Sequence, residues 1–156
     1  MRSLWRREDG TTAVEMAFVL VVAFPFMIGM VEFARAYWNW HSLVLAASEA
    51  SRYAMINATN GSLAACPAPS PAPTINGCTS GSSTYSSSNL PNCAAHQTNQ
   101  SLIGFPASSV SITITCAGSS PATMTVAATY NFDFIVPGLL PYGPITLTGT
   151  ALVPLM

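Results

Sequence analysis

Four cysteines have the most definite chemistry in this sequence, and all of them lie in its second, almost uncharged part: Cys66, Cys78, Cys93 and Cys116. No two of them are separated by two residues, as zinc-ribbon ligands would be. Cys93 and His96 have a ligand-like spacing, but one such pair commonly arises by chance, so we expect no metal site and no other cofactor. An even number of cysteines in an exported segment favours two disulfides, for which three pairings are possible.

The other ionisable residues do not form a catalytic set. The sequence contains no Gly-x-Ser-x-Gly, His-Glu-x-x-His or phosphate-loop pattern. His41 and His96 are not accompanied by a nucleophile and a partner acid or base in a recognisable pattern. We therefore name no catalytic residue and expect that this protein is not an enzyme.

Charge is concentrated in the first third of the chain. Charged residues make up 7% of the 156 residues, whereas a typical soluble domain has about 25%. All the basic residues are arginines that precede Tyr53, and after Tyr53 the only charged residue is Asp133. Nucleic-acid binding needs clustered cations, which this second part lacks. Its neutral composition, rich in Ser, Thr, Asn and Pro, indicates an exported domain.

Residues 11–31 form an apolar run whose single charged residue is Glu15. As a helix this run would be about 31 Å long, which matches the hydrocarbon thickness of a bilayer. Three arginines precede it, so the positive-inside rule places the N-terminus in the cytoplasm. A cleaved secretory signal is the alternative, but its apolar core is usually about 7–15 residues long and carries no acid. The length of this run and Glu15 at its head favour a membrane span.

The predicted helix continues beyond the membrane. Neither Pro nor Gly occurs between Val31 and Asn60, and Glu32 and Arg35 form an i,i+3 pair that can support a helix. Apolar residues recur at spacings of three and four and form one seam along it: Ala36, Trp40, Leu43, Ala47, Ala50 and Ala54. We therefore predict a single helix over 11–57, whose seam must be buried against another part of the chain.

Residues 58–156 are predicted to form the exported, disulfide-containing domain. Pro, Gly and Ser punctuate 58–92, which is predicted to be a loop, and 93–102 can form a short helix. Polar and apolar residues then alternate as in half-buried strands, in three segments: about 110–116, 124–134 and 145–153. The predicted fold is α+β. A long transmembrane helix extends into a small domain, where its seam covers a three-stranded, or slightly larger, antiparallel sheet.

Two residues within the span invite a functional interpretation. A carboxylate in a membrane segment is costly and usually has a partner or a function. No arginine lies three or four residues from Glu15, so a partner would have to come from elsewhere; the alternative is a side chain that reaches back to the cytoplasmic interface. Pro25 removes a helix hydrogen bond in mid-span. It is either a functional kink or a proline that the membrane helix simply tolerates.

The first part of the chain resembles a known family. The segment Arg6–Leu20 is similar to type IV pilin precursors, in which a short charged leader ends in Gly and the apolar helix that follows has Glu as its fifth residue. Gly10 ends such a leader here, and Glu15 is fifth when counted from Thr11. The continuation Ile28–Ala36 resembles the TadE-like family of Tad (tight adherence) pilus proteins, so the resemblance implies a pilin-like fold.

The resemblance also implies processing and assembly. A prepilin peptidase would cut after Gly10 on the cytoplasmic side, so that residues 1–10 are a leader and Thr11 is the mature N-terminus. The new amine of Thr11, or that of a neighbouring subunit, would then pair with Glu15. The implied partners are other pilins or pseudopilins of the same system, the peptidase and the lipid bilayer. The implied location is the inner membrane, crossed once, or the pilus itself, with the C-terminal domain periplasmic or extracellular.

One departure from the pattern indicates which kind of pilin this would be. Major Flp pilins carry Glu-Tyr where this chain has Glu15-Met16, and they are very short, whereas this chain has a large C-terminal domain. The sequence therefore favours a minor pilin or pseudopilin of a Tad/Flp-type pilus over the bulk subunit of the filament. The alternative function is a membrane-anchored envelope binding module that never enters a filament and needs no cleavage at Gly10.

Overall fold

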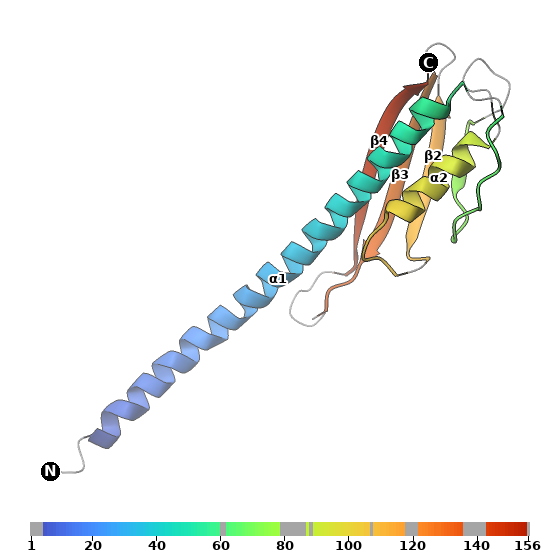
Figure 1. Cartoon of the computed structure of the whole chain (residues 1–156). Helices are drawn as coiled ribbons and strands as arrows, with labels where there is room; N and C mark the ends of the chain where they lie inside the picture. The colour runs from blue at the N-terminus through green and yellow to red at the C-terminus, as the bar shows by residue number, and fades with distance from the viewer. Residues whose placement is uncertain are drawn as a thin grey trace.

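The computed structural model describes residues 5–59, 62–78, 87, 89–106, 108–117, 122–135 and 143–155. It is an α+β structure in which one long helix, α1, extends from a small domain (Figure 1). The C-terminal part of α1 lies along a sheet, whereas its N-terminal part projects away from the domain (Figure 1). This arrangement of a long apolar helix followed by a small α+β domain confirms the predicted fold class.

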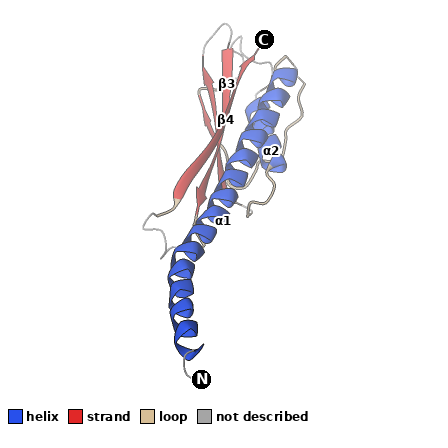
Figure 2. Cartoon of the chain, turned by 90° about the vertical axis from the view of Figure 1, so that its left-hand side faces the viewer, coloured by secondary structure: helices blue, strands red, loops and turns tan. Residues whose placement is uncertain are grey.

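Helix α1 spans Trp5–Asn57 and begins earlier than the predicted 11–57, inside the segment predicted to be a leader. Gly10 is incorporated in the helix, since a single Gly weakens a helix without ending it. The helix also continues through Pro25. Figure 2 shows that the N-terminal part of α1 is inclined to the part that packs on the sheet.

Helix α2 spans Leu90–Ser101 and begins three residues before the predicted 93–102. Pro91 lies in its first turn, where the missing N–H of proline would have no partner within the helix anyway. The Pro that suggested a loop therefore marks the start of this helix. The hydroxyl of the buried Thr98 donates a hydrogen bond of 3.0 Å to the carbonyl oxygen of Ala94 within the same helix.

Four strands form one mixed sheet in the order β1-β2-β3-β4. Strands β2 (Val110–Ala117), β3 (Ala122–Phe132) and β4 (Ile145–Leu155) form an antiparallel meander. The additional strand β1 (Thr74–Asn76) pairs in parallel with β2. It lies in the predicted loop 58–92, so the expectation of a purely antiparallel sheet was wrong in this respect. Three exposed residues are too few to show the alternation by which strands are recognised.

The core lies between one face of the sheet and the two helices (Figure 2). The sheet contributes buried alternating residues such as Ile112, Ile114 and Val126, and α1 contributes the later part of the predicted seam, from Leu43 to Ala54. Trp40 departs from the prediction because its side chain is 42% exposed. Further along the helix towards its N-terminus, Glu32 is buried instead, as described below.

Candidate functional site

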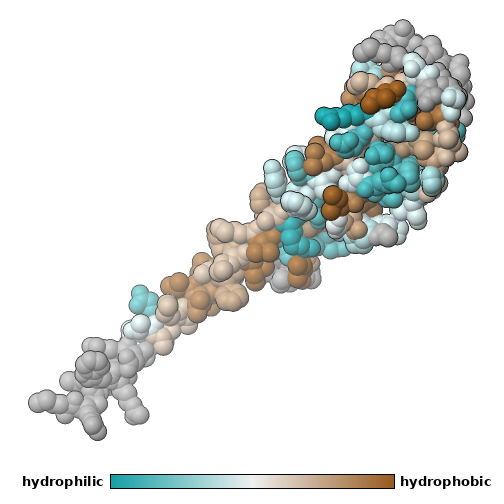
Figure 3. Space-filling view, in the orientation of Figure 1, coloured by the Kyte–Doolittle hydropathy of each residue, from teal (hydrophilic) through white to brown (hydrophobic). Residues whose placement is uncertain are grey.

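The N-terminal half of α1 presents apolar side chains that nothing in the described structure covers. Its apolar 18-residue window is 0% buried, and α1 is long and apolar enough to cross a membrane. Figure 3 shows this half as a continuous hydrophobic rod that ends where the domain begins. The large exposed side chains along it are Val14, Met16, Phe18, Val19, Leu20, Val21, Val22, Phe24, Phe26, Met27, Met30, Val31 and Phe33. An apolar surface of this extent marks an interaction with lipid or with other proteins.

The residues predicted to act in processing and assembly all lie near the start of this rod. Gly10, Thr11 and Glu15 follow one another along α1, and each is exposed. Thr11 and Glu15 are four residues apart, which places them on one face of the helix, a turn from each other. A Cβ atom built at Gly10 would meet nothing within 4 Å. Packing within the chain therefore does not explain a glycine at this position, and its predicted role in cleavage stays a prediction.

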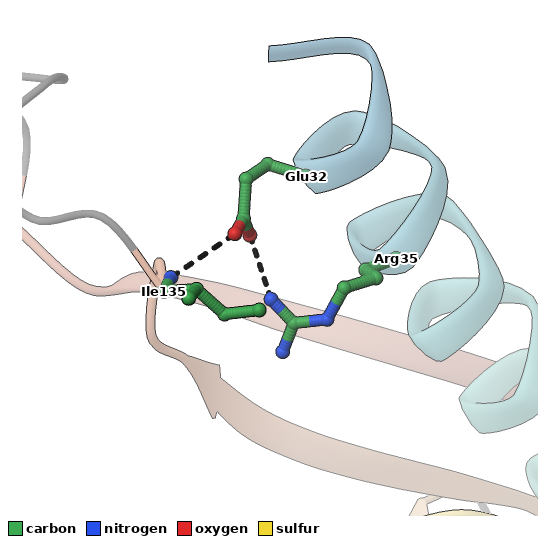
Figure 4. A network of polar contacts seen from close by, with 3 residues as sticks. All are labelled: Glu32, Arg35 and Ile135. Carbon is green, nitrogen blue, oxygen red and sulfur yellow. Dashed lines mark hydrogen bonds and ion pairs between the residues drawn. The ribbon is translucent and has the colours of Figure 1, made fainter. Parts of the chain in front are cut away.

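A buried carboxylate joins α1 to the segment that directly follows β3. Glu32 is only 3% exposed. Its Oε2 accepts a hydrogen bond of 2.7 Å from Nη1 of Arg35, and its Oε1 accepts one of 3.1 Å from the backbone N–H of Ile135 (Figure 4). The pairing with Arg35 agrees with the spacing in the sequence. The contact with Ile135 crosses 103 positions, and no local pattern could have revealed it.

Aromatic side chains complete this junction. The guanidinium carbon of Arg35 lies 5.1 Å from the ring centre of Phe132, a cation–π distance. Phe132 is fully buried and meets Phe134 edge to face, with the ring centres 5.4 Å apart. Arg35 is therefore held by the carboxylate of Glu32 and by the end of β3 together. The junction fixes how the exposed rod leaves the domain.

The structure joins the four cysteines in two disulfides, Cys66–Cys93 and Cys78–Cys116. The first connects the segment after α1 to α2, and the second connects the segment after β1 to the end of β2. Because the sulfur of Cys93 is bonded to Cys66, it cannot act as a thiolate ligand beside His96. In the described ranges, no group of three or more His, Cys, Asp or Glu side chains could hold a metal ion.

The model of the TadE-like protein family matches residues 10–52. This match begins at the predicted cleavage site and ends within the part of α1 that packs on the sheet. The resemblance drawn from the sequence is thereby confirmed over this segment. No curated protein and no solved structure matches the chain.

Proposed function

We propose that this chain, whose residues 10–52 match the TadE-like family, is a minor pilin-like subunit that assembles through the exposed half of α1. The observation that carries the proposal is the division of this one helix. Its C-terminal half packs one face into the core of a folded domain, whereas its N-terminal half exposes only apolar side chains and Glu15 over residues 13–31. One half thus builds the subunit, and the other is available for contacts outside it.

Two environments can remove the apolar side chains of the exposed half of α1 from water without any change in the domain. Each apolar side chain that leaves water contributes roughly 1.5–3 kcal/mol, so the rod must be surrounded by lipid or by other apolar helices. A bilayer supplies the first environment, and the helices of other pilins or pseudopilins supply the second. Transfer from one to the other leaves the junction at Glu32 and the core around Ile114 intact.

The subunit would cross the inner membrane once. The arginines before the span keep the N-terminus in the cytoplasm, where a prepilin peptidase would cut between Gly10 and Thr11. The domain would lie on the other side, where an oxidising environment permits the two disulfides. After cleavage, the amine of Thr11 would be a cation within one helical turn of Glu15. In the assembled pilus, the carboxylate of Glu15 would pair with the corresponding amine of a neighbouring subunit.

Mass spectrometry of the intact protein purified from membranes tests this function. We expect a mature chain that begins at Thr11 and carries two disulfides. A Gly10→Ala variant, whose altered side chain has free space in the folded chain, should keep the leader and fail to enter pili. A wild-type protein that retains its leader while pili assemble normally would contradict the proposal, and would favour a membrane-anchored binding module instead.

A further inference from the structure

Ile135 places a large apolar side chain of the domain beside the membrane half of α1. The side chain is 65% exposed, although the backbone N–H of the same residue is fixed on Glu32. Glu32 follows directly after the predicted span 11–31. The hydrogen bond therefore holds Ile135 at the level along α1 where the span ends (Figure 4).

Ile135 and the span line one shallow groove of about 390 Å³. Its other lining residues come from α1: Phe24, Met27, Ile28, Val31 and Glu32. The apolar members of this set extend the exposed rod without a break, and the domain adds Ile135 to the same surface. Any molecule that fills the groove must therefore contact apolar side chains of both the span and the domain.

The buried carboxylate at this level does not require water, whereas the half-exposed guanidinium of Arg35 and the exposed Asp133 stay within reach of it. The carboxylate of Glu32 already accepts hydrogen bonds from Arg35 and from the N–H of Ile135, and a carboxylate without such donors would be costly to bring near lipid. Asp133 is exposed, so it limits the depth to which this part of the domain can sink. At the boundary between acyl chains and headgroups, the hydrogen-bonded carboxylate of Glu32 can lie near lipid while Asp133 remains in contact with water.

We propose that Ile135 inserts into the bilayer leaflet that faces the domain, and that acyl chains fill the groove between it and α1. The domain would then touch the membrane at a second point and stand on it in one orientation. This inference rests on the membrane span of the proposed function. Continuity with that span favours lipid as the occupant over a helix of a second copy.

Methyl NMR on the unmodified chain tests the insertion. The protein is labelled with ¹³C at isoleucine δ1 methyl groups and placed, one copy per disc, in phosphatidylcholine nanodiscs. A nitroxide on the fifth acyl carbon broadens signals of methyl groups near the lipid. Ile28, within the span, is the positive control, and Ile56, which is 77% exposed at the far end of α1, is the matched negative control. An Ile135→Val variant assigns the signal.

We expect the Ile135 methyl signal to be broadened several-fold more than that of Ile56, and close to that of Ile28. If Ile28 is broadened but Ile135 behaves like Ile56, the insertion is wrong while the membrane span stands. If the Ile28 methyl signal is not broadened either, residues 11–31 do not span the bilayer, and the proposed function is wrong as well. If the Ile135 methyl signal is not broadened in discs that hold one copy, and its position in the spectrum changes only in discs that hold two copies, a second chain is the occupant. The proposal is then overturned.

Discussion

Gly149 of β4 lies directly against the backbone of Leu43 in α1. A Cβ atom built at Gly149 would come within 2.7 Å of the carbonyl oxygen of Leu43, closer than real Cβ atoms approach other atoms. The obstacle is the main chain of the helix, which cannot rotate away as a side chain could. A hydrogen atom in place of a side chain thus lets helix and sheet approach each other, and this is the point where the middle of α1 rests on the edge strand.

Replacement of Gly149 by Ala should therefore destabilise the domain. Overpacking of a tight core typically costs about 1–3 kcal/mol, and here the added methyl group must push α1 off β4. Denaturant unfolding of the detergent-solubilised protein, followed by circular dichroism, measures the change. Gly143→Ala is the matched control, because a Cβ atom there would meet nothing within 4 Å. Equal stability of the two variants would refute the close packing at Gly149.

The sequence already contains a signal for this contact. A single Gly within an alternating strand indicates a bulge or a close approach of another backbone, and Gly149 stands in the middle of the predicted strand 145–153. What the sequence lacks is the partner, because the seam of α1 offers several small residues at equivalent spacings. In the structure the backbone approached by Gly149 is that of Leu43, a large residue of the seam, while within the sheet Gly149 pairs with Ala128 of β3.

Removal of the Glu32 side chain should loosen the segment after β3 more than removal of its charge. Glu32→Gln keeps an oxygen that can accept from the N–H of Ile135, whereas Glu32→Ala removes the acceptor. One hydrogen bond contributes about 0.5–1.5 kcal/mol, so the amide of Ile135 should exchange with deuterium roughly 2–10 times faster in the Ala variant, with a smaller change in Gln. The amide of Val126, within the sheet, should keep its wild-type rate in both variants.

Hydrogen–deuterium exchange with residue resolution decides between this account and a merely local helix pair. If the amide of Ile135 exchanges at the same rate in all three proteins, Glu32 pairs with Arg35 alone, and the hydrogen bond from Ile135 to Glu32 does not form in solution. The contrast shows where sequence reasoning ends. Spacing on a helix predicts Glu32–Arg35, but nothing local connects either residue to Ile135, since a backbone N–H has no signature in the sequence.

Peptide mapping without reduction should recover the pairs Cys66–Cys93 and Cys78–Cys116 and no others. A double Cys78→Ser, Cys116→Ser variant should lose about 2–5 kcal/mol of stability. The loss should appear as faster proteolysis within 62–78, because β1 has only three paired residues. The Cys66–Cys93 pair should persist in this variant. Recovery of another pairing from the native protein would contradict the structure.

Cysteine count and compartment predict two disulfides, but the pairing depends on an element that the sequence hides. Strand β1 places Asn76 opposite Thr115, so Cys78 and Cys116 follow just beyond the paired positions. Gly77 has φ +68, and a Cβ atom there would lie 2.5 Å from the carbonyl oxygen of Cys116. The bridge thus needs a parallel strand and a glycine turn that become recognisable only once the sheet has formed.

Neutralisation of Glu15 should impair assembly and leave the domain unaffected. The residue lies on the exposed half of α1, far along the helix from the core and from both disulfides. Glu15→Gln keeps the size and polarity of the side chain but removes the charge. Membrane insertion should become easier, because an acid within a span is costly, whereas pilus incorporation should fall because the pairing with a neighbouring amine is lost.

The opposite signs of these two effects separate the prediction from general damage to the protein. Membrane level, disulfide state and pilus incorporation are measured for wild type, Glu15→Gln and the control Glu49→Gln, an exposed acid on the same helix beside the domain. The control should match wild type in all three. A Glu15→Gln protein that enters pili at the wild-type level would remove Glu15 from the assembly mechanism. Its carboxylate would then be one that only reaches back to the cytoplasmic interface, where water solvates its charge.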